Sequence, residues 1–168
     1  MLASPRLMAT ARFIPVPIAQ RAASLLFQRT LQIYPRLFDR LGSYGASRFS
    51  FIPSDFPFGF AVRPARRSIE TFRAPHEPLS DATIKGPLFL MLALAEGKVD
   101  GDAIFFARKL VVTGDMEAVL ALRNALDDCG LDLVASAGQL AGPFRSPVVH
   151  ALSALRRHAL IAQGVTWN

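Results

Sequence analysis

The hydrophobic residues of residues 18–41 follow a helical spacing. Apolar residues recur there every three or four positions, which predicts an amphipathic helix. Pro35 lies inside the stretch and removes a helical hydrogen bond, so we expect two helices. The predicted apolar face comprises Ala23, Leu26, Phe27, Leu31, Tyr34, Leu37, Phe38 and Leu41. A second face carries Arg21, Arg29, Arg36 and Arg40, whose positions around the helix axis fall within roughly 100° of one another.

The hydrophobic spacing changes to a period of two after residue 47, which is typical of β-strands. Four segments predict short strands: "RFSFIP", "FGFAVRP", "SIETF" and "DATIKG". The polar, proline-containing turn "RAPHEPLS" separates the last two. Phe58, Phe60 and Val62 fall on one face of the second strand. We therefore expect an antiparallel sheet of three or four strands with one face lined by phenylalanine.

The second half of the chain predicts helices with one further strand. "GPLFLMLALAEG", residues 86–97, predicts a short buried helix, and residues 110–112 predict a buried strand. Asp115 is a suitable N-cap and Gly130 a suitable stop for the helix between them. Residues 131–145 contain glycine and proline and predict a loop. A last helix is expected to begin near Ser146.

The net positive charge of the chain lies in its first half. Residues 1–75 hold 11 arginines and three acids, whereas residues 76–168 hold eight cations and ten acids. A basic front half indicates an anionic partner. The basic helix predicted over residues 18–41 either lies on an anionic membrane or packs on its own domain with a solvated arginine face. Residues 1–38 lack acids altogether, so a mitochondrial transit peptide is an alternative interpretation.

The residue types needed for catalysis do not converge in this sequence. Cys129 has no neighbouring histidine and lies in an apolar helix, which is a poor setting for a nucleophile. His76, His150 and His158 lack the spacing of a metal site. The calcium-loop pattern that starts at Asp100 fails, because its twelfth position is valine. Walker, Rossmann and G-x-S-x-G patterns are missing from the sequence.

The composition leaves two interpretations of the many apolar residues open. The chain has 13 phenylalanines, one tryptophan and two tyrosines. Its longest apolar run, residues 87–95, is too short to span a bilayer. Nucleic-acid binding is disfavoured, because the chain has only three lysines and no recognisable nucleic-acid motif. What remains is a plain hydrophobic core or a cavity for an apolar ligand, and periodicity does not distinguish them.

Residues 98–128, "KVDGDAIFFARKLVVTGDMEAVLALRNALDD", resemble the C-terminal half of a sterol carrier protein type-2 (SCP-2) domain. Within that superfamily they most resemble the UbiT-type accessory factors of ubiquinone biosynthesis. Ile104 stands where the UbiT pattern has leucine. The other matching positions are Asp102, Phe105, Phe106, Arg108, Lys109, Leu110, Val111, Val112, Gly114, Asp115, Asn124 and Asp127. The resemblance extends over roughly residues 30–130.

The resemblance implies an α/β (α+β) fold with a five-stranded sheet, helices over one face and a hydrophobic tunnel between them. A basic amphipathic helix precedes it here. Such domains bind lipids noncovalently and lack catalytic residues, so no enzymatic activity, metal or cofactor is expected. UbiT-type members are linked to isoprenoid quinone biosynthesis by the oxygen-independent route. They are thought to present polyprenylated intermediates to hydroxylases related to the U32 peptidases, and to contact anionic phospholipid.

These expectations assign three regions to the chain and two groups of binding residues. Residues 1–41 form a flexible lead-in and basic helix, residues 42–145 the lipid-binding domain, and residues 146–168 a C-terminal helix. The predicted cavity lining is Phe51, Phe58, Phe60, Val62, Ile84, Leu88, Phe89, Leu92, Phe105, Phe106, Val119, Leu120 and Leu126. The predicted membrane or headgroup contacts are Arg21, Arg29, Arg36, Arg40, Arg108 and Lys109. The expected location is the bacterial cytoplasm, partly at the inner membrane, with the mitochondrion as the alternative. A membrane-surface scaffold without a lipid ligand is the alternative function.

Overall fold

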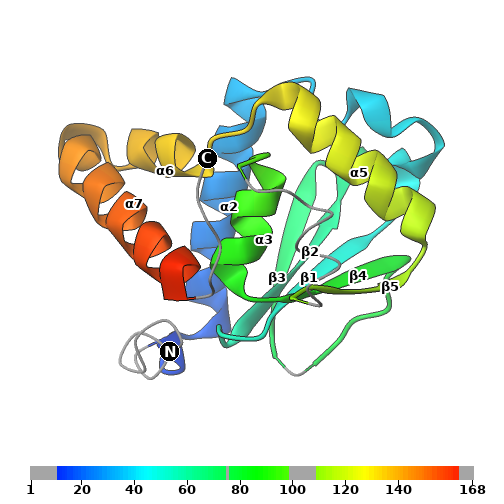
Figure 1. Ribbon diagram of the computed structural model, residues 1–168, viewed down its shortest axis with the longest axis horizontal. Coiled ribbons are helices and arrows are strands. Elements are labelled where there is room, and N and C mark those ends of the chain that lie inside the picture. Colours follow the sequence, from blue (N-terminus) through cyan, green and yellow to red (C-terminus); the bar gives the residue numbers. More distant parts are fainter. Residues whose placement is uncertain (1–10, 75, 99–108, 163–168) are drawn as a thin grey trace.

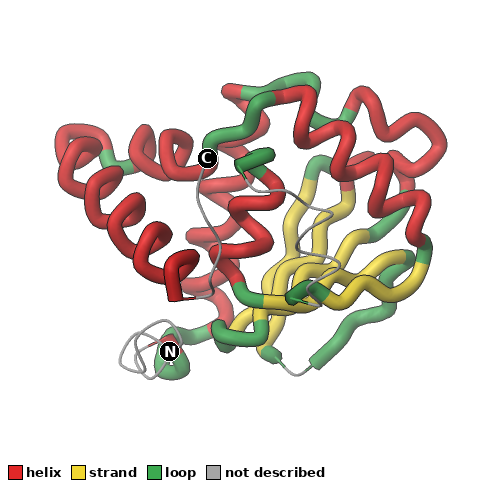
Figure 2. Tube along the Cα trace, viewed as in Figure 1, coloured by secondary structure: helices red, strands yellow, loops and turns green. Residues whose placement is uncertain are grey.

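A five-stranded β-sheet with helices over one face forms the centre of the protein (Figures 1 and 2). The computed structural model describes residues 11–74, 76–98 and 109–162. The strands are β1 (Phe49–Pro53), β2 (Phe58–Arg63), β3 (Ser68–Arg73), β4 (Ala82–Gly86) and β5 (Val111–Gly114). Their order in the sheet is β3-β2-β1-β4-β5. The predicted fold class is confirmed.

The register of the strands gathers the phenylalanines on one face. Phe51 of β1 is the direct partner of Phe60 of β2, and Phe49 is the partner of Val62. Directly opposed residues of neighbouring strands point to the same side of a sheet. Phe49, Phe51, Phe60 and Val62 therefore share the face that the helices cover, as the period of two predicted.

The expectation of a purely antiparallel sheet is wrong at one pair of strands. β4 runs parallel to β1, with Phe49 opposite Ala82. Residues after β3 return along the sheet and place Asp81 beside Arg48, just ahead of β1. The Asp81 amide donates to the Arg48 carbonyl at 3.0 Å, and the Arg48 amide donates to the Asp81 carboxylate at 2.7 Å. This pairing starts β4 beside the start of β1, in the same direction.

The helical spacing of residues 18–41 corresponds to one long helix followed by a shorter element. The long helix α2 spans Val16–Ile33 and stops before Pro35, so the predicted break is confirmed. The 3-10 element η1 covers Asp39–Ala46. Pro17 lies in the first turn of α2, where its missing N–H is not needed.

Capping residues mark the ends of the later helices. Helix α3 spans Leu88–Ala95 and α5 spans Met116–Cys129. The Asp115 carboxylate accepts the Ala118 amide at 3.0 Å, and Gly130 ends α5 in the left-handed conformation at φ 56°. Both capping predictions are confirmed. Helix α7 spans Arg145–Ala162, and the described residues also include two short 3-10 turns, η2 (Pro64–Arg66) and η3 (Gly142–Phe144).

Residues 131–145 are largely helical, so the loop predicted there is wrong. Helix α6 spans Leu133–Leu140, and the Asp132 carboxylate caps it by accepting the Ala135 amide at 2.8 Å. Gly138, which suggested a loop, lies where α6 meets α7. A Cβ at Gly138 would lie 2.4 Å from Val149 Cγ2. The glycine therefore serves close helix packing.

The strand predicted at residues 110–112 is only partly buried. Leu110 is buried, but Val111 is 54% exposed. Val112 pairs with Ile84 and so shares the helix-covered face of the sheet, whereas Val111 pairs with Lys85 on the opposite face. Leu110 lies over the end of β4, where a Cβ on Gly86 would be 2.2 Å from Leu110 Cδ2.

Candidate functional site

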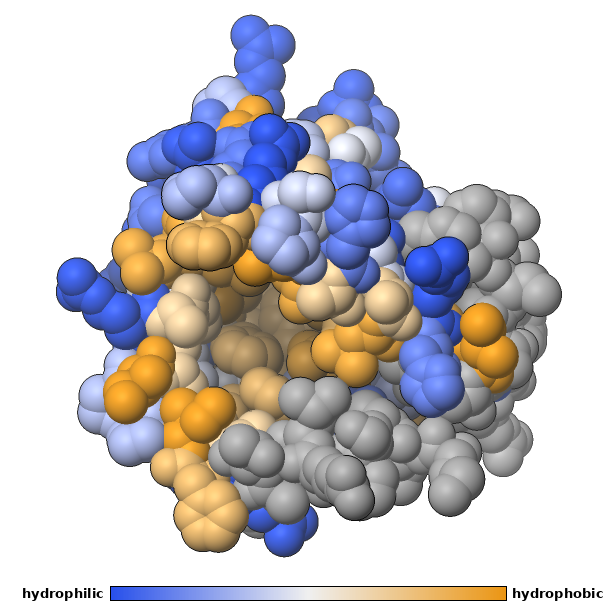
Figure 3. Space-filling view, turned by 90° about the vertical axis from the view of Figure 1, so that its left-hand side faces the viewer, coloured by the Kyte–Doolittle hydropathy of each residue, from blue (hydrophilic) through white to orange (hydrophobic). Residues whose placement is uncertain are grey.

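An apolar cavity of about 530 Å³ lies between α2 and the helix-covered face of the sheet. Figure 3 shows a hollow with hydrophobic walls on the side of the molecule that it draws. Helix α2 supplies Ile18, Ala19, Ala22, Ala23, Leu26, Phe27 and Thr30, and the strands supply Phe51, Phe58, Phe60, Val62 and Ile69. Helices α3 and α5 supply Leu88, Met91, Leu92, Ala95, Leu122 and Leu126. The remaining wall is Ile14, Leu37, Phe38, Phe56, Leu131 and Leu133.

The walls offer almost no polar chemistry. Among the described residues that line the cavity, Thr30 alone has a polar side chain. Its hydroxyl donates to the Leu26 carbonyl at 2.9 Å, so its donor is already satisfied. A ligand inside therefore gains from burial of apolar surface and from dispersion contacts.

Small residues on α2 leave room between the helix and the sheet. Ala19, Ala22 and Ala23 line the cavity from the helix side, opposite the phenylalanines of the sheet. Alanine fills little of the space that leucine would occupy, and protein interiors otherwise pack to the density of organic crystals. The alanines thus help to turn a helix–sheet interface into a cavity.

Polar side chains fasten α2 to the edge strand β3. The Gln20 amide nitrogen donates to the Ile69 carbonyl at 2.9 Å, while its oxygen accepts the Thr71 amide. Further along the helix, Gln28 donates to the Arg67 carbonyl at 3.1 Å. These contacts satisfy backbone groups at the edge of the sheet. They also hold α2 over the cavity as its outer wall.

Most of the predicted lining residues that the structure describes lie in the cavity wall, but four do not. Those in the wall are Phe51, Phe58, Phe60, Val62, Leu88, Leu92 and Leu126. Ile84 and Val119 pack in the core instead, Phe89 is half-buried elsewhere on α3, and Leu120 is 55% exposed. The helical period explains the last two. Leu88, Met91, Leu92 and Ala95 share the inner face of α3, which Phe89 does not, and Leu120 lies outside the inner face of α5 that carries Leu122 and Leu126. Phe105 and Phe106 lie outside the described residues.

Sequence reasoning missed the part of the wall that α2 contributes. Its apolar face was expected either to pack on its own domain or to lie on an anionic membrane, not to enclose a cavity. The spacing that identifies this face was visible in the sequence, but its distance from the phenylalanine-lined sheet was not. Lipid binding by any of these residues stays a prediction.

The predicted arginine face does not lie on a single helix. Arg36 is exposed in the turn after α2, and Arg40 in η1 forms an ion pair with Asp128 of α5. Arg21 is exposed on α2, and Arg29 donates to Gln32 at 2.9 Å. The break at Pro35 separates the two pairs. Lys109 is half-buried ahead of β5, and Arg108 lies outside the described residues.

The cysteine and histidine side chains that the structure describes lie in settings typical of structural residues. Burial raises the pKa of the Cys129 thiol, which disfavours a thiolate nucleophile. His150 and His158 are exposed, and the His150 ring donates to the Ser146 carbonyl at 2.8 Å. Within the described ranges, no group of three or more His, Cys, Asp or Glu residues could hold a metal ion. No helix in the same ranges is long and apolar enough to cross a membrane.

A buried ion pair joins α3, α6 and α7 behind the cavity. Glu96 follows α3, is almost fully buried and pairs with Arg156 of α7. It also accepts the Leu133 amide of α6 at 2.9 Å. Burial raises the pKa of Glu96, and the neighbouring Arg156 opposes that shift. The pair therefore lies next to Ala95 and Leu133, which stand in the cavity wall.

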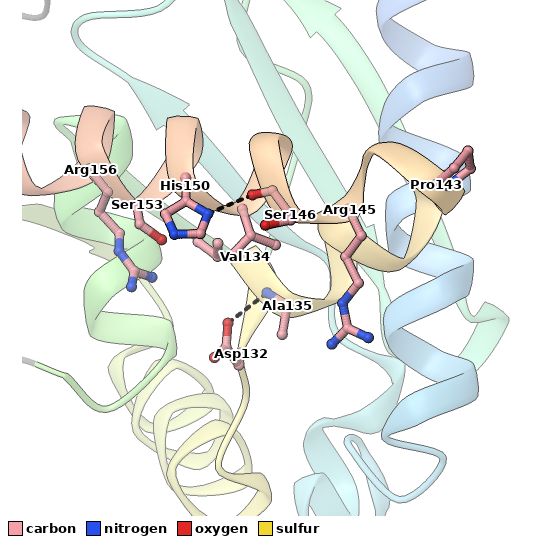
Figure 4. Close-up of a pocket in the computed structure, with 10 residues that line it drawn as sticks. Asp132, Val134, Ala135, Pro143, Arg145, Ser146, His150, Ser153 and Arg156 are labelled. Carbon is pink, nitrogen blue, oxygen red and sulfur yellow. Dashed lines mark hydrogen bonds between the residues drawn. The ribbon is translucent and has the colours of Figure 1, made fainter.

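A second hollow, of about 510 Å³, lies between α6 and α7 and has both polar and apolar lining residues (Figure 4). Asp132, Arg145, Ser146, His150, Ser153 and Arg156 are among its lining residues. Three of these are engaged within the protein: Asp132 caps α6, His150 bonds to Ser146, and Arg156 pairs with Glu96. This hollow marks the polar joint between the two helices.

Comparison with known proteins identifies the family. The model of the SCP-2 sterol transfer family matches residues 27–127, more than half of the chain. The protein belongs to this family, and the predicted membership is confirmed. No curated protein matches the sequence.

One solved structure shows a similar fold at low identity, and others match with lower scores. A structure named UbiJ-SCP2 ubiquinone synthesis protein is 16% identical, with a TM-score of 0.54, and the match covers 71% of this chain and 98% of that one. Apo sterol carrier protein 2 of Yarrowia lipolytica is 13% identical, with a TM-score of 0.46 and coverage of 63% and 90%. Sterol carrier protein 2 of Aedes aegypti, solved with palmitate, is 13% identical, with a TM-score of 0.44 and coverage of 60% and 96%.

Proposed function

We propose that this member of the SCP-2 sterol transfer family is a non-catalytic carrier that binds a lipid in its apolar cavity. The observation that supports this most is the cavity itself: of its described lining residues only Thr30 has a polar side chain, and that hydroxyl is already hydrogen-bonded within α2. A volume of about 530 Å³ lies within the usual range of small-ligand pockets. A ligand that buries about 400 Å² of apolar surface gains about 10 kcal/mol before the cost of association is subtracted.

The lipid we propose is a polyprenylated precursor of ubiquinone. The signature at residues 98–128 supports this choice, and the neighbour named as a ubiquinone synthesis protein has the same fold. The apolar tail occupies the cavity, and the aromatic headgroup stays near its opening, where an enzyme can reach it. The partners are hydroxylases related to the U32 peptidases, in the oxygen-independent route.

The place of action we propose is the bacterial cytoplasm, partly at the inner membrane surface, with the mitochondrion as the alternative. Arg21 and Arg36 are exposed and can meet anionic phospholipid. Each cation near such a surface contributes about 1 kcal/mol. The competing function is a membrane-surface scaffold without a lipid ligand.

Native mass spectrometry with lipid extraction tests the carrier function. We expect the purified protein to retain an apolar ligand. Leu92→Asp places a carboxylate in the cavity wall and should abolish retention, whereas Leu79→Asp, at a residue that is 94% exposed, should not. A folded protein that carries no lipid and takes none from vesicles would favour the scaffold.

A further inference from the structure

Arg73, the last residue of β3, does not line the apolar cavity itself but contacts two residues that do, Phe58 and Ile14. It is the direct cross-strand partner of Phe58, so both side chains point to the helix-covered face of the sheet. Its guanidinium carbon lies 5.0 Å from the centre of the Phe58 ring. One of its nitrogens donates to the Ile14 carbonyl at 2.9 Å. Since Phe58 and Ile14 both line the cavity and Arg73 is exposed, the cation stands where the cavity meets solvent.

Backbone carbonyls fix the position of this guanidinium. Its second bond goes to the Arg12 carbonyl at 3.1 Å, and a carbonyl carries no net charge. Among the described residues no carboxylate forms an ion pair with Arg73, whereas Arg40 and Arg48 pair with acids. Arginine has five N–H donors, so donors remain for another acceptor. The contact with the Phe58 ring shields one side of the cation from water and strengthens its pull on an anion.

The surroundings of Arg73 suit the headgroup end of a lipid. Phe13 is 86% exposed and Ile18 is 60% exposed, so apolar side chains accompany the cation at the rim. Asp55, which precedes the lining residue Phe56, is buried and accepts the Leu88 amide at 2.7 Å. Its carboxylate is therefore committed to the start of α3.

The length of the cavity fits one extended chain behind that headgroup. Lining residues on α2 run from Ile18 to Thr30, about 18 Å at the rise of an α-helix. The far end is closed by Leu131 and Leu133, which pack in a cluster with Leu31 and Leu37. An apolar chain laid along α2 from Arg73 would thus meet apolar walls and, at Thr30, one hydroxyl that already donates to the Leu26 carbonyl.

We propose that Arg73 binds the anionic headgroup, a carboxylate or a phosphate monoester, of the lipid whose chain fills the cavity. This assignment rests on the carrier function proposed above and adds an orientation to it. A charge-assisted, bidentate contact is the arrangement in which arginine binds such groups best. The headgroup would be held at the rim, where it remains accessible to a partner protein.

The test compares two probes with chains of the same length, palmitate and hexadecanol, by titration calorimetry on the whole chain. The wild-type protein should bind palmitate about ten-fold more tightly than hexadecanol, because a charge-assisted hydrogen bond is stronger than a neutral one. Arg73→Gln should remove this preference and leave hexadecanol binding within two-fold. Arg66→Gln makes the same change at an exposed arginine outside the cavity wall and should alter neither affinity.

Two further measurements separate a headgroup contact from a packing role of Arg73. Carbon NMR of carboxyl-labelled palmitate should give a lower pKa for the bound acid in the wild type than in Arg73→Gln, since a cation favours the carboxylate form. Arg73→Lys keeps the charge but loses the bidentate geometry and the bonds to the Arg12 and Ile14 carbonyls, so its preference for palmitate should lie between those of the wild type and Arg73→Gln.

Each contrary result has a distinct meaning. Equal loss of palmitate and hexadecanol in Arg73→Gln, or an unchanged pKa of the bound acid, would overturn the assignment of Arg73 and leave the carrier function standing. If acetate competed as well as palmitate, Arg73 would bind a free anion rather than a lipid headgroup, which also overturns the proposal. A wild-type protein that binds neither chain would refute the carrier function itself.

Discussion

Filling the cavity with a larger side chain provides a direct test of whether α2 encloses a binding site. Ala23 lines the cavity from the helix side, and Ala23→Phe directs a ring toward the sheet. A phenylalanine side chain covers 150–250 Å² when fully buried, so the ring denies a ligand about 100 Å² of apolar contact. At 25 cal/mol per Å², the loss is about 2.5 kcal/mol, or about 70-fold in affinity.

The same substitution should leave stability unchanged or increase it. A ring that enters an empty apolar space gains burial without displacing neighbours, up to about 2 kcal/mol. In a filled core it would overpack the site and cost about 1–3 kcal/mol. The sign of the change in the free energy of unfolding therefore distinguishes a cavity from a tightly packed core.

Urea denaturation and binding of a fluorescent fatty acid, measured on one preparation, provide the assay. Ala65→Phe is the matched control, because Ala65 is exposed in η2 and contributes nothing to the cavity wall. We expect Ala23→Phe to bind about 70-fold more weakly at equal or higher stability, and the control to bind normally. A variant destabilised by more than about 1 kcal/mol, or one with normal affinity, would refute the reasoning.

Three further outcomes test other parts of the structure. Arg156→Met should lower the free energy of unfolding near neutral pH by about 3 kcal/mol, because it leaves ionised Glu96 buried without its partner. Burial raises the pKa of Glu96, so the stability contributed by this group is present at acid pH and lost as the pH rises through the raised pKa. The destabilisation by Arg156→Met should therefore be smaller at acid pH than near neutral pH, and an equal destabilisation under the two conditions would contradict this. Gly114→Ala should cost at least about 2 kcal/mol in denaturant titrations, since φ is 89° there and a Cβ would lie 2.2 Å from the Asp81 carbonyl oxygen; a stable variant would show that the turn relaxes. Reversing Arg21 and Arg36 to glutamate should weaken sedimentation with anionic vesicles at low salt, and unchanged sedimentation would place the membrane contact elsewhere.

Local signals in the sequence predicted the elements that depend on local chemistry. The period of two in the strands, the break at Pro35 and the caps at Asp115 and Gly130 each follow from a few neighbouring residues. The structure confirms all of these. The sheet face with Phe58 and its neighbours could be predicted for the same reason, because alternation in one strand fixes which side chains share a face.

Features that depend on distant residues could not be predicted in this way. The parallel pairing of β4 with β1 is set by Arg48 and Asp81, 33 residues apart. Gly138 indicated a loop because the close approach of Val149 that explains it belongs to another helix. Leu120 looked like a lining residue until the direction of α5 was known, since every apolar residue of a helix is a candidate before its inner face is defined.

The two ends of the cavity differ in charge, and that difference orients a ligand. Behind Ala95 and Leu133, the buried pair of Glu96 and Arg156 is neutral as a unit and is used to fasten three helices. At the opposite end, Arg73 has no acidic partner among the described residues and is held in place by carbonyls and an aromatic ring. Under the proposed function, the end beside the neutral pair suits the terminus of an apolar chain, while Arg73 at the other end suits a negative headgroup. An uncharged lipid would gain nothing from that cation, so the binding preference between an acid and an alcohol of one chain length reports the orientation directly.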